Sequence, residues 1–278
     1  MKHSHINRKW TKKVAFLTVA TSITIGTAGL APLSAWADLS NGNSVSVKIT
    51  SPKVHALVKT PELPITVLAS GFTVDAGFAG TPVSATIGHY HEILDGKLID
   101  MAPVMDSTKD TISMMGVKRG RHTLTIVPAR NDHSMVMSGA ASIPFTYSGK
   151  FIPLTAGYKG LEAPSISITS PAPGSTVTGT SFTLAAKISN FVVCGGCFGK
   201  NLVHGEGHWH IFVDQPMMAN MLTMANGPTQ DVSLKGITPG VHTFWAVLVD
   251  NSHMPFMDMK TKMMLAGTAT SIQLNVQP

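Results

Sequence analysis

The sequence predicts an all-β protein made of two tandem β-sandwich domains, and three observations lead to this prediction. Short runs rich in Val, Ile, Thr and Phe recur along the chain, with Gly, Pro, Asn or Ser between them, as in strands joined by turns. After the N-terminal region, no segment shows the 3.6-residue apolar period of an amphipathic helix. The chain is also internally duplicated, because the same motifs return in the same order 119 or 120 residues later.

The duplication is clearest in three stretches. They are ITSP at 49–52 and 168–171, GHYHEILD at 88–95 matched by GHWHIFVD at 207–214, and residues 116–137 matched by 236–257. Four histidines of one copy therefore correspond to four of the other. The pairs are His89 and His208, His91 and His210, His122 and His242, and His133 and His253. Each copy spans roughly 110 residues, which is enough for one small core.

Five runs in each copy predict strands. They are SVSVKIT, PITVLAS, SATIGHYHEIL, HTLTIV and SIPFTY in the first copy, and SISITS, SFTLAAKI, GHWHIFVD, HTFWAVLV and SIQLNV in the second. Strands separated by turns at such intervals are typical of a sandwich or barrel. The segment ITPGVHTFWAVLVDN (237–251) resembles the penultimate hairpin of many immunoglobulin-like bacterial domains. The resemblance implies two immunoglobulin-like sandwiches, at 38–150 and 164–278, joined by a linker over 151–163.

The first 37 residues predict a signal peptide. A basic start is followed by an apolar run from Val14 to about Leu33, and AWA at 35–37 fits the small-x-small cleavage rule. We expect the mature chain to begin at Asp38 and to be exported to the periplasm, the cell surface or the medium. An uncleaved N-terminal anchor is the alternative, because the run is long enough to span a bilayer. No membrane association is expected once the signal is removed.

The formal charge of +6 gives no indication of a nucleic-acid partner. Five of the 21 basic residues lie in the predicted signal and all 15 acids lie after it, so the remainder carries 16 − 15 = +1. Aromatic residues make up 6% of the chain, too few for base-stacking platforms. The sequence contains no P-loop, G-x-S-x-G or G-x-G-x-x-G motif. These features exclude nucleotide and serine-nucleophile chemistry from the prediction.

The histidine pattern predicts a metal site in each copy. Residues two apart on a strand share a face, so each H-x-H run directs two imidazoles the same way. We expect His89 and His91 to meet His122 or His133, and His208 and His210 to meet the corresponding His242 or His253. For a single strand histidine the alternative is a hydrogen-bonded core or rim residue. Neutral imidazole suits zinc, copper, iron and nickel.

Methionines next to the later histidines favour copper over zinc. The segment HMPFMDM (253–259) places Met254, Met257 and Met259 in a loop-like stretch, where thioethers are not needed as core fillers. Thioether is a soft ligand that prefers Cu(I), whereas imidazole accepts both copper states. Copper is therefore the predicted metal and zinc the alternative, with packing as the non-functional interpretation of the methionines.

The second copy alone contains a C-x-x-C motif. Cys194 and Cys197 stand where the first copy has DAGF (75–78). In an exported protein the pair predicts a short-loop disulfide, and the alternatives are a redox pair or two thiolate ligands near His204, His208 and His210. Asp95 and Asp214 follow the two H-x-H runs, either as acceptors of a ring N–H or as strand-end acids.

Three further resemblances accompany these motifs. GHWHIFVD followed by PGVHTFWAVLVDNSHMPF is similar to an exported bacterial domain family with a G-H-x-H strand, a G-x-H-T strand and a later histidine. The loops rich in Met and His are similar in style to exported copper-resistance proteins with an immunoglobulin-like fold. HYHE (89–92) resembles the H-x-H-E strand of copper-zinc superoxide dismutases, although Ile211 replaces the glutamate in the second copy.

The function predicted from these patterns is binding, sequestration or transfer of copper in the cell envelope by a protein that is not an enzyme. One alternative is an envelope module that binds another protein or a glycan without metal. A second alternative is a copper enzyme acting on superoxide or a similar small oxidant.

Overall fold

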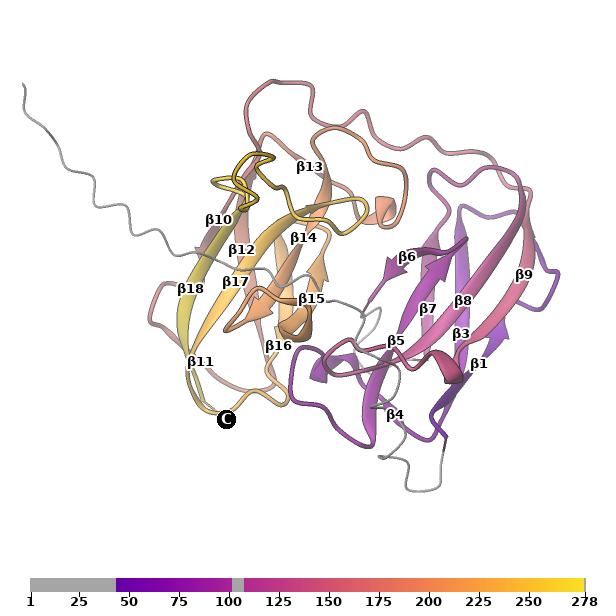
Figure 1. Cartoon of the computed structure of the whole chain (residues 1–278), viewed down its shortest axis with the longest axis horizontal. Helices are drawn as coiled ribbons and strands as arrows, with labels where there is room; N and C mark the ends of the chain where they lie inside the picture. Colours follow the sequence, from indigo (N-terminus) through magenta and orange to yellow (C-terminus); the bar gives the residue numbers. More distant parts are fainter. Residues whose placement is uncertain (1–43, 102–107, 278) are drawn as a thin grey trace, which may run out of the picture.

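The computed structural model describes residues 44–101 and 108–277, and the predicted signal peptide lies outside this range. Its regular structure consists of β-strands with a few short 3₁₀ turns (Figure 1). In the described ranges, no helix has the length and apolar character needed to cross a membrane.

The first repeat forms two layers, whose strands are antiparallel except for the short parallel pairs β2–β9 and β4–β5. One is a three-stranded sheet in the order β1 (Ser46–Ser51), β3 (Glu62–Ser70), β7 (Lys109–Ser113). The other is a six-stranded sheet in the order β2 (Leu57–Val58), β9 (Ala141–Tyr147), β8 (Gly120–Arg130), β5 (Ile87–Leu94), β4 (Thr73–Val74), with β6 (Lys97–Asp100) also paired to β5. The 3₁₀ turns are η2 (Ala76–Phe78) and η3 (Met137–Gly139).

The second repeat has the same topology. Its three-stranded sheet runs β10 (Ser165–Ser170), β12 (Ser181–Ser189), β16 (Thr229–Ser233). Its six-stranded sheet runs β11 (Thr176–Val177), β18 (Ala269–Val276), β17 (Gly240–Asp250), β14 (Glu206–Val213), β13 (Val192–Val193), with β15 (Met221–Ala225) on β14. The turns are η4 (Gly195–Cys197) and η5 (Met218–Asn220). The predicted fold of two tandem immunoglobulin-like β-sandwiches is confirmed. The five strands predicted in each copy are present, but the two-residue strands and also β6, β7, β15 and β16 were not predicted.

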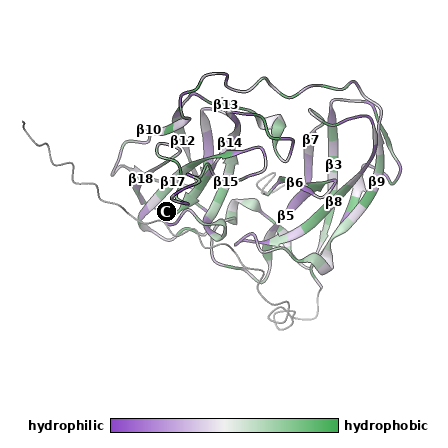
Figure 2. Cartoon of the chain, turned by 45° about the horizontal axis from the view of Figure 1, so that its top comes forward, coloured by the Kyte–Doolittle hydropathy of each residue, from purple (hydrophilic) through white to green (hydrophobic). Residues whose placement is uncertain are grey.

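Alternation along the strands builds a core inside each sandwich. Tyr90, Leu124 and Phe145 are buried in the first core, and Trp209 and Phe244 in the second. The Trp209 indole also donates a hydrogen bond to the carbonyl of Gly227 at 2.8 Å, which satisfies its polar atom. Apolar residues accordingly lie on the strands of both halves (Figure 2). Because side chains alternate, residues next to these on β5 and β14 must point away from the cores.

Those outward faces meet each other. Met101 of the first repeat and Phe212, Met221 and Val247 of the second form one buried apolar cluster, which we call the interface cluster. In Figure 1, β6 and β15 lie between the two halves of the molecule. The outer face of each six-stranded sheet is therefore buried around β5 and β14, although it is exposed at the outward residues of β9 and β18.

The repeats contact each other reciprocally. On one side Lys235 donates to the Asp75 carboxylate at 2.7 Å, and the turn η2 lies against the segment after β16. On the other side η4 lies against the segment after β7, where Cys197 Sγ is 3.8 Å from Met115 Sδ. Met115 and Lys235 occupy corresponding positions of the two repeats. The same two surfaces therefore meet on both sides, through an ion pair at Lys235 and through a sulfur–sulfur contact at Met115.

Lys200 is a buried cation near this interface, and its removal is expected to stabilise the protein. Its Nζ has no hydrogen-bond partner among the described residues, and burial lowers its pKa from 10.5 to about 8, with Asp95 raising it and Lys97 lowering it. Below pH 8 the folded state must hold this charge out of water. Between pH 8 and 10.5 the unfolded chain binds more protons, so stability rises with pH.

The variant Lys200→Met is therefore expected to raise the free energy of unfolding at pH 7 by about 2 kcal/mol, and to lose this advantage above about pH 10.5. Chemical denaturation at pH 7 and pH 10.5 measures both values. The matched control is Lys187→Met, because Lys187 is exposed and carries no burial penalty. Equal effects of the two substitutions at pH 7 would contradict the burial argument.

Candidate metal centre

Strand β5 places two imidazoles on its outward face. His89 and His91 pair with Ala129 and Val127 of β8, while Tyr90 between them enters the core. The third ring comes from the turn after β8, where His133 has a φ of 62°. A non-glycine residue in this left-handed region is uncommon, and such residues occur preferentially at functional sites.

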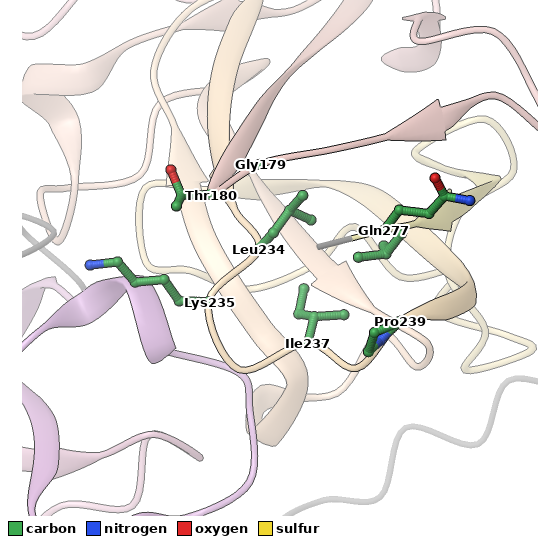
Figure 3. A pocket seen from close by; sticks show the side chains of 8 residues that line it. Gly179, Thr180, Leu234, Lys235, Ile237, Pro239 and Gln277 are labelled. Carbon is green, nitrogen blue, oxygen red and sulfur yellow. The ribbon is translucent and has the colours of Figure 1, made fainter.

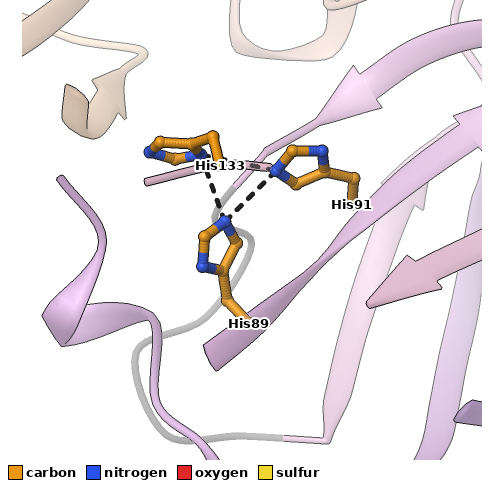
Figure 4. Close-up of side chains that lie close together, drawn as sticks. All are labelled: His89, His91 and His133. Atoms are coloured by element: carbon orange, nitrogen blue, oxygen red, sulfur yellow. Dashed lines mark hydrogen bonds between the residues drawn. The ribbon is translucent and has the colours of Figure 1, made fainter. Parts of the chain in front are cut away.

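The three rings converge on one point. His89 Nε2 lies 3.2 Å from His91 Nε2 and 3.1 Å from His133 Nδ1 (Figure 4). His91 Nε2 lies 3.4 Å from His133 Nδ1. All three side chains are buried. Three metal–nitrogen bonds of about 2.0–2.1 Å at tetrahedral angles would place the nitrogens about 3.3 Å apart. The first cluster therefore has the geometry of a three-histidine metal site.

The second repeat builds the same cluster. His208 Nε2 lies 3.0 Å from His210 Nε2 and 3.1 Å from His253 Nδ1, and His210 Nε2 lies 3.5 Å from His253 Nδ1. His253 has a φ of 66° and is buried with its partners. In both repeats, two Nε2 atoms from the strand and one Nδ1 atom from the turn therefore converge at nearly the same separations.

A tight turn brings the third histidine back over the sheet. The amide of His133 donates to the Arg130 carbonyl at 2.9 Å, and that of His253 to the Asp250 carbonyl at 3.0 Å. Short acids stabilise the turns, since Asp132 accepts from the Ser134 amide and Asp250 from the Ser252 amide. Asp and Ser favour such local side-chain hydrogen bonds, which explains why NDHS and NSH form turns instead of prolonging the strands.

Burial keeps these rings neutral. It is the largest cause that lowers the pKa of each of the six histidines, and for His89, His91, His208 and His210 neighbouring histidines lower the pKa further. The neutral ring is the form that binds metals. In each cluster, nitrogens with lone pairs at this spacing repel one another unless a proton or a cation lies between them. The donor set therefore fits an ion that prefers imidazole.

His122 and His242 do not belong to the clusters, which corrects their assignment as candidate ligands. His122 lies five residues along β8 from Val127, the partner of His91, and five residues of strand span roughly 16 Å. Its Nδ1 faces Asp95 Oδ2 at 2.7 Å and its Nε2 faces the Lys118 carbonyl at 2.8 Å. His242 makes the equivalent contacts with Asp214 and Thr238. Both histidines hold neighbouring backbone and side chains together by hydrogen bonds. Asp95 accepts from the ring of His122, and Asp214 accepts from the ring of His242.

The methionines predicted as ligands lie outside the buried part of the centre. Met254 and Met259 expose 59% and 78% of their surface, whereas His253 exposes 9%. Met257 forms an isolated backbone bridge with Met264. The segment 253–259 is indeed a loop. Among the described His, Cys, Asp and Glu residues, two of the three buried groups that could hold an ion consist of imidazoles alone, and the third joins Cys194, Cys197 and Glu206.

The structure joins Cys194 and Cys197 in a disulfide at η4. Their sulfurs lie close to the carboxylate of the buried Glu206, whose Oε1 accepts a hydrogen bond from the side-chain amide of Asn251 at 2.8 Å. Phe198 follows the pair and lies against His208, with ring centroids 4.1 Å apart. The disulfide thus borders the second cluster through Phe198.

One set of contacts had no counterpart in the sequence-based prediction. His133 Nε2 lies 2.7 Å from the Met221 carbonyl, and His253 Nε2 lies 3.1 Å from the Leu98 carbonyl, each in the other repeat. Backbone carbonyls leave no residue-specific signal in a sequence.

A pocket of about 220 Å³ near Leu234, Ile237 and Gln277 contains no histidine (Figure 3) and gathers no comparable polar groups.

Comparisons with known proteins found distant structural similarities only. No family model and no curated protein matches the chain. Fibronectin(III)-like modules of CbhA from Clostridium thermocellum are similar at 15% identity and a TM-score of 0.26, over 83% of this chain and 94% of that one. Titin domains z1z2 give 13% and 0.21, over 84% and 97%. Latent PorU from Porphyromonas gingivalis gives 10% and 0.27 over 88% of this chain, which spans only 21% of PorU.

These scores are too low to carry an argument about function. The assignment of the fold rests on the order and pairing of the strands in this chain. The resemblances to copper-resistance proteins and to an exported domain family stay predictions.

Proposed function

We propose that this protein binds two transition-metal ions, one in each three-histidine cluster, and that it is an exported protein that sequesters or hands on copper. The observation that supports the proposal most directly is the convergence of three buried, neutral imidazole nitrogens within 3.0–3.5 Å, repeated in both halves of the chain. A hydrogen-bonded core histidine can be satisfied by a single partner, and ordinary packing does not require three ring nitrogens to converge on one point.

The choice between copper and zinc depends on the surroundings of the clusters. Three imidazoles suit both ions, and zinc fits a tetrahedral site especially well. Copper is favoured by the exposed thioethers of Met254 and Met259, which lie next to His253 in the chain and can meet incoming Cu(I) at the surface. Transfer would then proceed from these soft surface ligands to the buried imidazoles.

Metal titration tests the proposal. We expect two equivalents of Cu(II) or Zn(II) to bind the wild-type chain, and free metal at about 100 times Kd to stabilise the fold by about 2.7 kcal/mol per site. Calorimetry gives the stoichiometry and thermal unfolding gives the stabilisation. The control is a chain with all six cluster histidines replaced by Gln, whose melting temperature should ignore both ions.

A second titration separates the two metals. Replacing Met254, Met257 and Met259 together with Leu conserves volume, so the fold should lose less than about 1.5 kcal/mol. Cu(I) affinity should fall in this variant while Zn(II) affinity stays unchanged, because thioether selects the softer ion. Unchanged Cu(I) affinity would leave zinc as the better candidate.

A further inference from the structure

Resting on the proposed function, we infer that each repeat positions the third metal ligand of the other repeat, so that the two sites become competent only when the repeats are docked. The inference concerns His133 and His253, which are ligands on turns, and the backbone carbonyls of Met221 and Leu98, which act as positioning groups.

The first step is the direction of the hydrogen bonds. A carbonyl oxygen only accepts, so the Nε2 of His133 carries the hydrogen that it shares with Met221 O at 2.7 Å. The ring is then fixed as the Nε2–H tautomer, and its Nδ1 lone pair faces His89 and His91. The same reasoning applies to His253 and Leu98 O at 3.1 Å. Metal-bound imidazoles are commonly held in this way by an acceptor on the ring nitrogen that does not bind the metal.

The second step is that the rings of His133 and His253 need a contact outside their own turns to fix their orientation. His89, His91 and His208 have no partner for their Nδ1 atoms among the described residues, and their strands hold them in place instead. His133 and His253 lie on turns with left-handed backbone angles, where no ladder fixes the side chain. For both turn ligands, the hydrogen bond to a carbonyl of the other repeat orients the ring, and the backbone of Met101 in the first repeat also contacts His133.

The third step links the two clusters physically. Met221 opens β15, which pairs with β14, so that Met221 is opposite Phe212 and Met224 is opposite His210. Leu98 lies on β6 opposite Ile93 of β5, the strand that carries His91. The acceptor for the turn ligand of one cluster is therefore attached to the strand that carries the ligands of the other cluster.

The interface carbonyls are also tightly held. A Cβ added to Gly80 would lie 2.6 Å from Met221 O, and one added to Gly199 would lie 2.2 Å from Leu98 O. Both glycines occupy corresponding positions in the repeats, and each amide donates to an Asn carbonyl near the turn histidine, Asn131 or Asn251. Docking therefore has little freedom at these two points, and a small displacement of one repeat moves the acceptor away from the ring. By linkage, a metal that binds the docked form also strengthens docking.

A charge reversal at the interface tests this coupling in the full chain. The background carries His208→Gln and His210→Gln, so that only the first cluster binds, and Co(II) is the probe because its absorption reports coordination. Lys235→Glu breaks the pair with Asp75 from the second repeat and changes no residue of the first cluster. We expect at least a tenfold loss of Co(II) affinity. The control Lys187→Glu makes the same charge change on the exposed surface of the same repeat and should leave affinity within about twofold.

Glycine substitutions give a second, independent variant pair. Gly80→Ala inserts a methyl against Met221 O, whereas Gly96→Ala has a similar φ of 79° and meets nothing within 4 Å. Both changes carry the same left-handed strain, so a loss of Co(II) affinity specific to Gly80→Ala reports the interface contact. Near-UV circular dichroism verifies that each variant is folded before its affinity is compared.

Nitrogen-15 NMR of histidine-labelled protein without metal supplies a readout that does not depend on the proposed function. His133 and His253 should be Nε2–H tautomers, and Lys235→Glu should mix the His133 tautomers. Absence of Co(II) binding together with these tautomers would overturn the metal function but leave the positioning intact. Nδ1–H tautomers at His133 and His253, or equal Co(II) affinity in Lys235→Glu and Lys187→Glu, would overturn the inference itself.

Discussion

Replacing His133 with alanine is expected to weaken Zn(II) or Cu(II) binding by the first cluster more than about a hundredfold, whereas replacing His122 should change it by less than about twofold. Removal of a partner behind a ligand already costs 10–100-fold in typical metal sites, and loss of the ligand itself costs more. His133 contributes the Nδ1 that lies 3.1 Å from His89 Nε2, while both ring nitrogens of His122 face other partners.

For the stability of the metal-free protein, the expected order of the two variants is reversed: His122→Ala should have the larger effect. His122→Ala removes contacts to Asp95 and Lys118 at the end of β8 and is expected to lower the free energy of unfolding of the metal-free protein by about 1 kcal/mol. Competition with a chelator, in the background that lacks His208 and His210, gives the affinities, and urea denaturation gives the stabilities. A metal affinity that falls equally in both variants would show that the cluster is not the binding site.

The fold was predictable because each signal for it is local. Alternation in GHYHEIL and GHWHIFV, and the turn residues between runs, depend on neighbours in sequence, and the duplication doubles every such observation. Strands of two residues, such as β4 (Thr73–Val74) and β13 (Val192–Val193), escaped prediction because two residues show no period. Their pairing with β5 and β14 is decided by contacts across the sheet.

Two of the three histidines of each cluster followed from sequence as candidate ligands because both lie on one strand. The H-x-H spacing alone places His89 beside His91, and His208 beside His210. The third ligand remained ambiguous between His122 and His133, since each follows at a matched position in both repeats. Only the antiparallel register of β5 and β8 decides it, by placing Val127 rather than His122 opposite His91.

The interface could not be predicted because its recognition elements are not side-chain motifs. Met221 and Leu98 act through their carbonyls, and Phe212 and Val247 look like ordinary strand residues in the sequence. An outward strand face that is apolar and rich in histidine is consistent with exposure, ligand binding or docking. The structure shows that docking and the candidate metal clusters share this one face.

The glycine before each H-x-H run yields the second large prediction. Gly207→Ala is expected to lower the free energy of unfolding by about 3 kcal/mol, because a Cβ there would lie 2.0 Å from the Val249 carbonyl of β17. Its φ is not in the left-handed region, so the obstacle is the neighbouring strand and not the backbone angle. A drop in Tm of roughly 6–12 °C should follow for a protein of this size. The displaced strand also carries His208, so the second cluster should lose metal affinity.

Two further glycines make the argument quantitative. Gly88 occupies the same position in the first repeat, where a Cβ would lie 2.5 Å from the Ala129 carbonyl, so Gly88→Ala should cost less than Gly207→Ala. A Cβ added to Gly227 would have the Thr229 carbonyl as its nearest neighbour, at 3.9 Å, so Gly227→Ala should change stability by less than about 1 kcal/mol. Thermal unfolding of the three variants without metal should therefore rank them Gly207, Gly88, Gly227 in decreasing loss of Tm. If Gly207→Ala melted like Gly227→Ala, the glycine of the G-H-x-H motif would need an explanation other than close approach of the adjacent strand.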